Sequence, residues 1–518
     1  MRQGFATSQA WYRALLLVFF FTPVISARQD SHQHPAPEKL GVVSFPTSCK
    51  AGLQREFEKG VALLHSFAYS RAETSFRKVA EEDPDCAIAH WGIAMTYFHQ
   101  LWDPPIYAGA FARGRQEIER AQQIGKDSDR ERRFIHALAP FYDRDLSAIP
   151  YTERVSRYEN AMGELAKAYP KDVESQVFYA LALLAVASPF DKTHAKQKQA
   201  VSILDPLYRK YPRHPGIAHY LIHACDNREM ARHGLAAARA YSKIAPSAPH
   251  ALHMPSHIFT RLGMWRDSIA SNKAARAAAH SQGDIGEELH AMDYLVYALL
   301  QEGRDREARE ILEQLKVMPA LHEGDFKVAY AATAMPVRYA VERQDWVEAA
   351  AIAPPSGAPP QVTAVAVWAR GIGLARTGRP AGARQEVKRL RQLERQLRAS
   401  SAGYSEYWAE QVDIQAVEVS AWLAQAEGKP GEARNLLREA ADDEDATEKL
   451  PVTPGPIVPA REQLGDLLLE QKQPALARKE FRVALANAPG RRGAFMGMLR
   501  ASKALANSAP PSARLESQ

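Results

Sequence analysis

The stretch Leu464–Pro489 reads LGDLLLEQKQPALARKEFRVALANAP. Apolar residues recur three and four positions apart on both sides of the polar centre QKQP, which predicts two amphipathic helices joined by a short turn. Small residues, one aromatic residue and a final proline mark the pattern: Leu464-Gly465, Ala477, Phe481, Ala484 and Pro489. Such a helix pair is apolar on faces that it cannot bury alone, so it predicts further pairs stacked against it.

Further copies of the pattern run along the chain. Arg71–Pro84 (RAETSFRKVAEEDP) repeats the second half, with an alanine, a phenylalanine, an alanine and a proline in the same order. Gly303, Gly378 and Gly428 each lie at a turn that is followed by a helix of small residues. The pattern resembles the tetratricopeptide repeat (TPR), two antiparallel helices in about 34 residues.

The resemblance implies an all-α fold. We expect an α-solenoid of stacked helix–turn–helix repeats that forms a right-handed superhelix with a concave groove. The resemblance covers most of residues 50–500, and its register is blurred between residues 103 and 211, where the number of repeats stays open. Four passages, LLHSFAYSRAETSF, DPDCAIAHWGIAM, AHYLIHACD and PHALHMPSHIF, also resemble uncharacterised exported bacterial TPR proteins. That second resemblance supports the fold and implies no particular activity.

The N-terminus predicts export. Arg2 and Arg13 precede the apolar run ALLLVFFFTPVI, and small residues follow at Ala27, which is the order of a secretory signal peptide. The run is too short to span a bilayer, and Pro23 interrupts it. Because no second apolar span follows, we expect a periplasmic or secreted protein; an uncleaved anchor is the alternative.

The repeats and their breaks divide the chain into six expected parts. These are a signal peptide (1–27), a flexible leader (28–47), N-terminal TPR-like repeats (48–210), His-rich TPR-like repeats (211–350), C-terminal TPR repeats (351–500) and a disordered tail (501–518). The segments APPSGAPPQ and DDEDATEKLPVTPGPIVP are long breaks between helices that we expect to be flexible.

Charge argues against a nucleic-acid partner. The formal net charge is +6, and basic residues alternate with acidic ones, as in RQLERQLR. That alternation is typical of solvated helix faces. Basic patches interleaved with aromatic residues are absent from the sequence, so no nucleic-acid surface is predicted.

Histidines recur in phase with the repeat. The passage that starts at His219 aligns without a gap with the passage that starts at His253, at an offset of 34 residues. His223 then aligns with His257, so the motif HxxxH occurs twice. Residues four apart lie on one helix face, with Cβ atoms roughly 6 Å apart, which suits two imidazoles that bind one ion.

Other candidate residues lie at matching sequence distances before the turn glycines of their repeats. In TPR proteins the side chains at these offsets face the inner groove, and the resemblance therefore implies one groove wall made of several residues. This candidate site comprises His219, His223, His250, His253, His257, His290 and Asp293, with His65 and His99, themselves 34 residues apart, as a secondary set.

Two functions are open for this groove. TPR grooves bind extended peptides or partner helices, so the first interpretation is a protein- or peptide-binding scaffold. The second is a metal-binding or metal-dependent protein, because imidazole suits Zn, Cu, Ni and Fe. The motifs HExxH, CxxC and GxSxG and a Walker-type loop are all absent from the sequence, so an enzyme is the less favoured class. The oligomeric state stays open.

Pro255 qualifies the metal interpretation. A proline inside a helix removes a hydrogen bond and clashes with the preceding turn. Either the helix bends at Pro255 or it begins there, and in the second case His253 and His257 need not share a helix face.

The cysteines predict one disulfide. Cys49 and Cys86 each open the first helix of a repeat, and stacked repeats bring such positions together. Export would place the pair in an oxidising compartment, where disulfides persist. Cys225 would then be a free thiol, and a buried structural role is favoured for it over a metal ligand.

Overall fold

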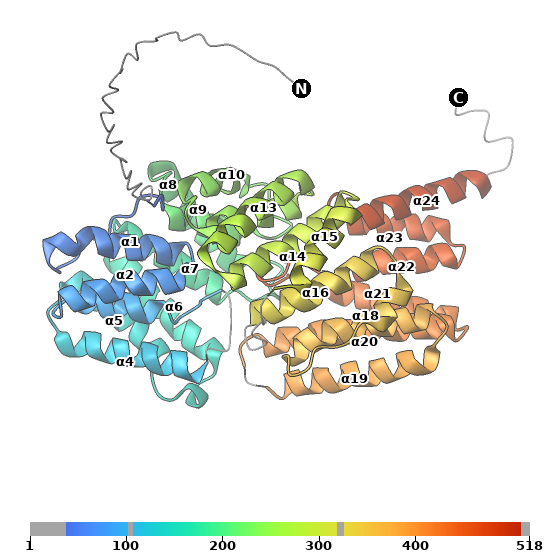
Figure 1. The fold of residues 1–518 in the computed structure, drawn as a ribbon, viewed down its shortest axis with the longest axis horizontal. Helices are drawn as coiled ribbons and strands as arrows, with labels where there is room; N and C mark the ends of the chain where they lie inside the picture. Colours follow the sequence, from blue (N-terminus) through green and yellow to red (C-terminus); the bar gives the residue numbers. More distant parts are fainter. Residues whose placement is uncertain (1–37, 102–106, 319–325, 401, 509–518) are drawn as a thin grey trace, which may run out of the picture. The chain divides into compact units, whose positions relative to one another are not determined.

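The chain folds into antiparallel helix pairs that pack in sequence order. The computed structural model describes residues 38–101, 107–318, 326–400 and 402–508, and this part contains helices and no strand. Figure 1 illustrates the arrangement with α18 (Pro360–Arg376), α19 (Pro380–Arg398) and α20 (Ser405–Ala426), because each helix lies against the next one along the chain. The array is thus an all-α solenoid of TPR-like helix pairs. None of its described helices is both long and apolar enough to cross a membrane.

The helices up to the middle of the chain are η1 (Ala51–Leu53), α1 (Gln54–His65), α2 (Tyr69–Glu82), α3 (Ala87–Met95), α4 (Ala108–Ile124), α5 (Asp129–Leu138), η2 (Ala139–Phe141), η3 (Leu146–Ala148), α6 (Tyr151–Ala168), α7 (Val173–Ala185), α8 (Ala195–Lys210), α9 (Pro215–Cys225), α10 (Leu235–Ile244), α11 (Pro249–His253) and α12 (Pro255–Arg261). The remainder are α13 (Trp265–Gln282), α14 (Ile285–Gln301), α15 (Asp305–Lys316), α16 (Phe326–Glu342), α17 (Trp346–Ala351), α18 (Pro360–Arg376), α19 (Pro380–Arg398), α20 (Ser405–Ala426), α21 (Pro430–Asp445), α22 (Ala460–Glu470), α23 (Pro474–Asn487) and α24 (Arg492–Ser508).

Glycines packed against one phenylalanine ring set the distance between consecutive helices. A Cβ atom built at Gly465 on α22 would lie 2.6 Å from the Phe481 ring, and one built at Gly497 on α24 would lie 2.3 Å from it. Gly60 and Gly92 contact Phe76 in the same way, at 2.7 and 2.5 Å. Real Cβ contacts are not this short, so only glycine lets three neighbouring helices close around one buried aromatic ring.

The ends of the helical array differ from the expected boundaries. Phe45, expected in a flexible leader, is fully buried, and its ring packs 5.2 Å from the Phe57 ring. The Val42 amide also donates to the Arg213 carbonyl oxygen at 2.9 Å. Residues 39–47 therefore belong to the folded array, because Phe45 fills part of its core. Likewise, residues 501–508 continue α24, and Ala501 is buried. The expected signal peptide, the leader before residue 38 and the tail after residue 508 lie outside the described residues.

A disulfide joins two successive repeats at the N-terminal end of the array. Cys49 precedes η1, Cys86 precedes α3, and the two residues are bonded with their Cα atoms 4.9 Å apart. This is the pair that the sequence singles out. The bond encloses α1 and α2 in one covalent loop.

The long break between α21 and α22 is held against the rest of the array. We call residues 446–459 the strap. The Lys449 ammonium lies 2.6 Å from an Asp226 oxygen, the Tyr294 hydroxyl donates to the Thr453 carbonyl at 3.0 Å, and Arg338 donates to the Pro456 carbonyl at 3.2 Å. This segment was expected to be flexible, but buried polar groups of α14 and α16 and of the residue after α9 hold it in place.

Candidate metal centre

Six histidines meet in the interior of the helical array. They come from α9, α11, α12 and α14: His219, His223, His250, His253, His257 and His290. Their exposed fractions lie between 0 and 7%. The repeat therefore brings these side chains together as the 34-residue offset suggests, but it places them inside the protein rather than on the wall of an open groove.

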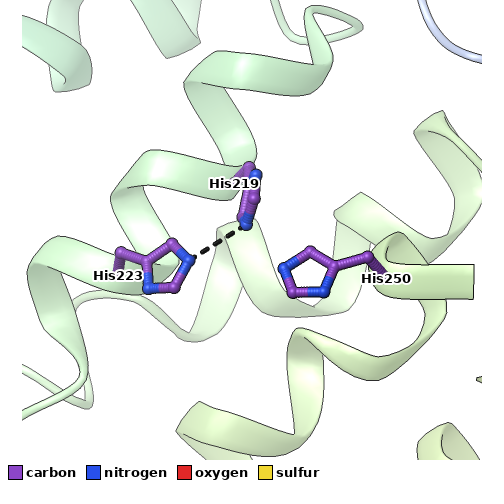
Figure 2. Close-up of side chains that lie close together, drawn as sticks. All are labelled: His219, His223 and His250. Carbon is purple, nitrogen blue, oxygen red and sulfur yellow. Dashed lines mark hydrogen bonds between the residues drawn. The ribbon is translucent and has the colours of Figure 1, made fainter. Parts of the chain in front are cut away.

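The first triad consists of His219, His223 and His250. One ring nitrogen of each lies within 4.8 Å of the other two. Figure 2 shows the three rings turned toward a common space, with His219 and His223 one helical turn apart on α9. Their Nε2 atoms are 3.1 Å apart. The Nδ1 atom of His219 donates to the His65 carbonyl oxygen at 2.6 Å, because a carbonyl can only accept.

The second triad consists of His253, His257 and His290, again with one nitrogen of each within 4.8 Å of the others. The Nδ1 atom of His257 lies 2.8 Å from an Asp226 carboxylate oxygen, to which it donates. The Nδ1 atom of His253 donates to the Asn272 Oδ1 atom at 2.7 Å. The Asn272 amide nitrogen itself donates to the Ser268 carbonyl, and this bond fixes which end of the amide faces His253.

These contacts fix the tautomers of two rings in the second triad. With Nδ1–H donating, the Nε2 atoms of both His253 and His257 carry lone pairs, and these atoms face one another at 3.0 Å. Two lone pairs at this distance repel unless a cation lies between them. A tetrahedral ion with metal–nitrogen bonds of about 2.0–2.1 Å holds its ligands roughly 3.3 Å apart. The separation of the two Nε2 atoms is close to that of two ligands around one ion.

A proton is a poor substitute for that cation. Burial lowers the pKa of His257 to about 4, although the Asp226 carboxylate opposes the shift. Burial also lowers the pKa of His253 well below its usual value, and the neighbouring His257 and His250 add to the effect. At neutral pH both rings are uncharged, which is the state that a metal ion requires of an imidazole ligand.

Asp226 connects the second triad to the strap. Burial alone would raise the pKa of Asp226, but Lys449 and Arg261 hold it well below the usual range, so the carboxylate is ionised. The Arg261 Nε atom donates to Asp226 at 2.9 Å, and the Lys449 ammonium lies 2.6 Å from it. One buried anion thus orients His257 while two cations balance its charge.

The chain bends at Pro255 without separating the histidine pair. Helix α11 ends at His253, α12 begins at Pro255, and Met254 between them keeps helical dihedral angles (φ −51°, ψ −35°). The helix therefore restarts at Pro255, yet His253 and His257 remain on one face. The concern that the proline would separate the two rings does not apply to this geometry.

A third group of buried histidines serves as an internal contrast. His65 and His214 each place Nε2 at 2.8 Å from one oxygen of Glu174. The other ring nitrogen of His65 lies 2.9 Å from the Tyr220 hydroxyl, and that of His214 accepts the Ile217 amide at 3.3 Å. Every ring nitrogen here has a protein partner of suitable polarity, so this group is a closed hydrogen-bond network that needs no ion.

The remaining candidate residues lie outside the two triads. Asp293 lies 3.8 Å from Arg338. His99 stacks on Tyr69 at 4.1 Å between ring centroids. Cys225 is buried, and burial raises the pKa of its thiol to about 12, which leaves it protonated at neutral pH.

The substitution Asp293→Asn is expected to change the pH dependence of stability. Burial raises the pKa of Asp293 to about 6, although Arg338 opposes the shift. The folded chain therefore holds a proton on Asp293 that the unfolded chain releases near pH 4. The contribution of this proton to the free energy of unfolding is complete below pH 4 and is lost as the pH rises through 6. Relative to the variant, the wild-type free energy of unfolding should fall by roughly 2–3 kcal/mol between pH 4 and 7. Urea denaturation of both proteins at a series of pH values measures this fall. A difference in free energy of unfolding between the two proteins that does not vary with pH would contradict the raised pKa of Asp293.

The sequence did not predict the residues that orient the histidines. Asp226, Asn272 and Glu287 accept Nδ1–H from His257, His253 and His250 respectively, the last at 3.0 Å. The passage HACD places Asp226 three residues after His223, which is a usable local signal. Lys449 carries no such signal, because it lies more than two hundred residues further along the chain.

Comparison with known proteins identifies no family for this chain. No protein-family model matches the chain, and no curated protein matches it. Among solved structures, yeast Tom70 shows 12% identity over 89% of this chain and 91% of that one, with a TM-score of 0.33. The P58(IPK) TPR domain shows 14% over 88% and 99% (TM-score 0.24), and the human IFIT1 dimer with PPP-AAAA shows 12% over 86% and 89% (TM-score 0.38). A likeness at this level does not extend to ligands or partners.

Proposed function

We propose that the chain is a metal-binding protein and that its second triad holds a transition-metal ion. The observation that carries the proposal is the pair of Nε2 lone pairs of His253 and His257, which face one another at 3.0 Å with both Nδ1 atoms engaged as donors. His290 supplies the third nitrogen from α14, with its ring centroid 4.2 Å from that of His253. Three imidazoles leave a coordination position open for a water or a substrate.

The surroundings of the triad support the proposal. Histidines that bind metals almost always donate their second ring nitrogen to a carboxylate, a carbonyl or a water, and this bond sets the orientation of the ring. The Asp226 carboxylate and the Asn272 carbonyl have this relation to His257 and His253. Imidazole donors suit Zn, Cu, Ni and Fe, whereas Mg and Ca prefer oxygen.

The metal content of the purified full-length chain tests the proposal. The protein is produced in medium supplemented with copper, zinc, nickel and iron, dialysed, and analysed for each element. We expect at least one tightly held equivalent in the parent protein and one equivalent fewer in His257→Gln. Glutamine retains a donor for Asp226, so circular dichroism should show unchanged helicity.

His280→Gln is the matched control, because the His280 side chain on α13 is 78% exposed. It should retain the full metal content. His32 and His34, which lie outside the described residues, are replaced by glutamine in every protein so that a loosely held ion at the N-terminus is not counted. A metal-free parent protein, or a His257→Gln variant with undiminished metal content, would overturn the proposal.

The scaffold function is a second candidate, located at a different place. A cavity of about 620 Å³ is bordered by the strap and by aromatic side chains of α16 and α20, Tyr330, Tyr407 and Trp408. Aromatic side chains beside charged groups such as Arg261 and Arg461 suit a peptide segment. Peptide capture that persists in His257→Gln and is lost in Trp408→Ala would assign this role to the cavity.

A further inference from the structure

We infer that the first triad holds a second ion, so that the six histidines form a dinuclear copper centre with imidazole ligands only. This inference rests on the proposed function and extends it from one ion to two. It concerns the number of ions, their distance from one another and the kind of metal that this donor set selects.

The first triad has the features of a metal site. His219 donates Nδ1–H to the His65 carbonyl, so its Nε2 atom carries a lone pair, and this lone pair points at the Nε2 atom of His223. The Nδ1 atom of His223 is buried and has no hydrogen-bond partner among the described residues. Without an ion, the Nε2 atom of His223 carries a proton and donates it in a hydrogen bond to the Nε2 atom of His219. With an ion, that proton moves to Nδ1 and both Nε2 atoms become ligands.

The two triads are close enough to form one centre. The ring centroids of His223 and His257 are 5.9 Å apart, and those of His250 and His253 are 6.0 Å apart. Within a triad the corresponding separations are similar, for example 5.0 Å between His219 and His250. The six rings are therefore continuous, and ions held by the two triads would be near neighbours.

The donor set favours copper. Both triads offer neutral imidazole nitrogens, while the nearby carboxylates of Asp226 and Glu287 are engaged with ring N–H groups and with Lys449 and Lys327. For a nitrogen site the affinity of divalent ions rises along the first transition row to a maximum at copper. Neither a thiolate nor a carboxylate is placed among the converging ring nitrogens, so the usual ligands of iron–sulfur and magnesium sites are missing from both triads.

A small cavity lies beside one histidine of the centre, His223. A cavity of about 70 Å³ borders His223, Asp226 and Lys449, at the edge of the strap. Its volume accommodates a molecule of a few heavy atoms, because one water occupies about 30 Å³ of liquid. Water, hydroxide or a diatomic molecule therefore fits the cavity beside His223, whereas a peptide does not.

Copper titration of the full chain tests the inference, with His32 and His34 replaced as above. The parent protein should bind two equivalents of Cu²⁺, and His223→Gln and His257→Gln should bind one each. In the parent protein the electron paramagnetic resonance spectrum should show coupling of the two spins, by lost intensity or a half-field transition. Each single variant should show the ordinary spectrum of one isolated Cu²⁺ ion.

The outcomes separate this inference from the proposed function. A parent protein that binds one equivalent, lost in His257→Gln, would leave the proposed function standing and overturn the dinuclear centre. A parent that binds none would overturn both. Two equivalents without spin coupling, or two equivalents retained in His223→Gln, would place the second ion elsewhere and overturn the inference. Binding of zinc in preference to copper in a competition titration would overturn the choice of metal.

Discussion

Asp226→Asn should both destabilise the metal-free protein and weaken its metal binding. Asp226 contacts His257, Arg261 and Lys449, and its side chain is only 6% exposed. Removing the anion leaves the Lys449 ammonium, whose side chain is 7% exposed, without its ion-pair partner, while Arg261 keeps Glu448 at 3.4 Å. Breaking a buried ion pair typically costs about 3–5 kcal/mol. The substitution also weakens the acceptor that orients His257, because a neutral amide replaces the carboxylate, and changes to such partners lower metal affinity about 10–100-fold. Urea denaturation with chelator measures the first effect, and competition with a metal indicator measures the second.

Asp205→Asn provides a matched comparison. Asp205 also pairs with a histidine, His233, at 2.8 Å, but the two side chains are 28% and 50% exposed. Exposed ion pairs contribute about 0–1 kcal/mol, so this variant should keep nearly the parental stability and the parental metal affinity. If the two variants behaved alike, Asp226 would not have the central role that its contacts indicate.

Arg491→Met should produce the second large effect, at the other end of the helical array. The Arg491 side chain is fully buried and donates to Glu462 at 2.8 Å, to Glu342 at 3.0 Å and to the Tyr297 hydroxyl at 3.1 Å. Methionine fills similar space but leaves two buried carboxylates unpaired, and the free energy of unfolding should fall by about 3–5 kcal/mol. The midpoint of urea denaturation measures this loss.

Two further variants decide whether charge is the cause. Arg492→Met changes the next residue, whose side chain is 50% exposed beside Asp305, and should cost less than about 1 kcal/mol. Adding Glu342→Gln and Glu462→Gln to Arg491→Met should recover part of the loss, because neutral amides tolerate burial better than unpaired carboxylates. No recovery would mean that packing, not charge, accounts for the effect.

The helix pairs and the histidine register could be predicted from local sequence. The turn glycines, Phe76 and Phe481 indicate where the helices lie, because each of these sequence signals is contained within a single repeat. The offset that aligns His219 with His253 also follows from the repeat, and it brings residues of neighbouring units together. The burial of these histidines could not be predicted, because it depends on a segment that lies in another repeat.

The strap shows why the rest of the site was missed. Residues 446–459 have no helical periodicity, and their contacts depend on single distant partners such as Asp226 and Tyr294. Phe45 is similar, since one aromatic residue in a polar leader gives no periodic signal, yet it occupies a core position beside Phe57. In both cases tertiary contacts decide what local patterning cannot.

The disulfide between Cys49 and Cys86 predicts which end of the array unfolds first. Repeat arrays lose structure from their termini inward, because a terminal unit has a neighbour on one side only. The covalent loop has a sequence separation of 37 residues, and closing such a loop restricts the unfolded chain by on the order of 3–4 kcal/mol. At the opposite terminus, α24 has no such tie and leaves Phe495, Met496 and Leu499 nearly half exposed. Fraying should therefore begin at α24 and travel toward the histidines, so that amide protons are retained longest in the disulfide-closed end of the chain.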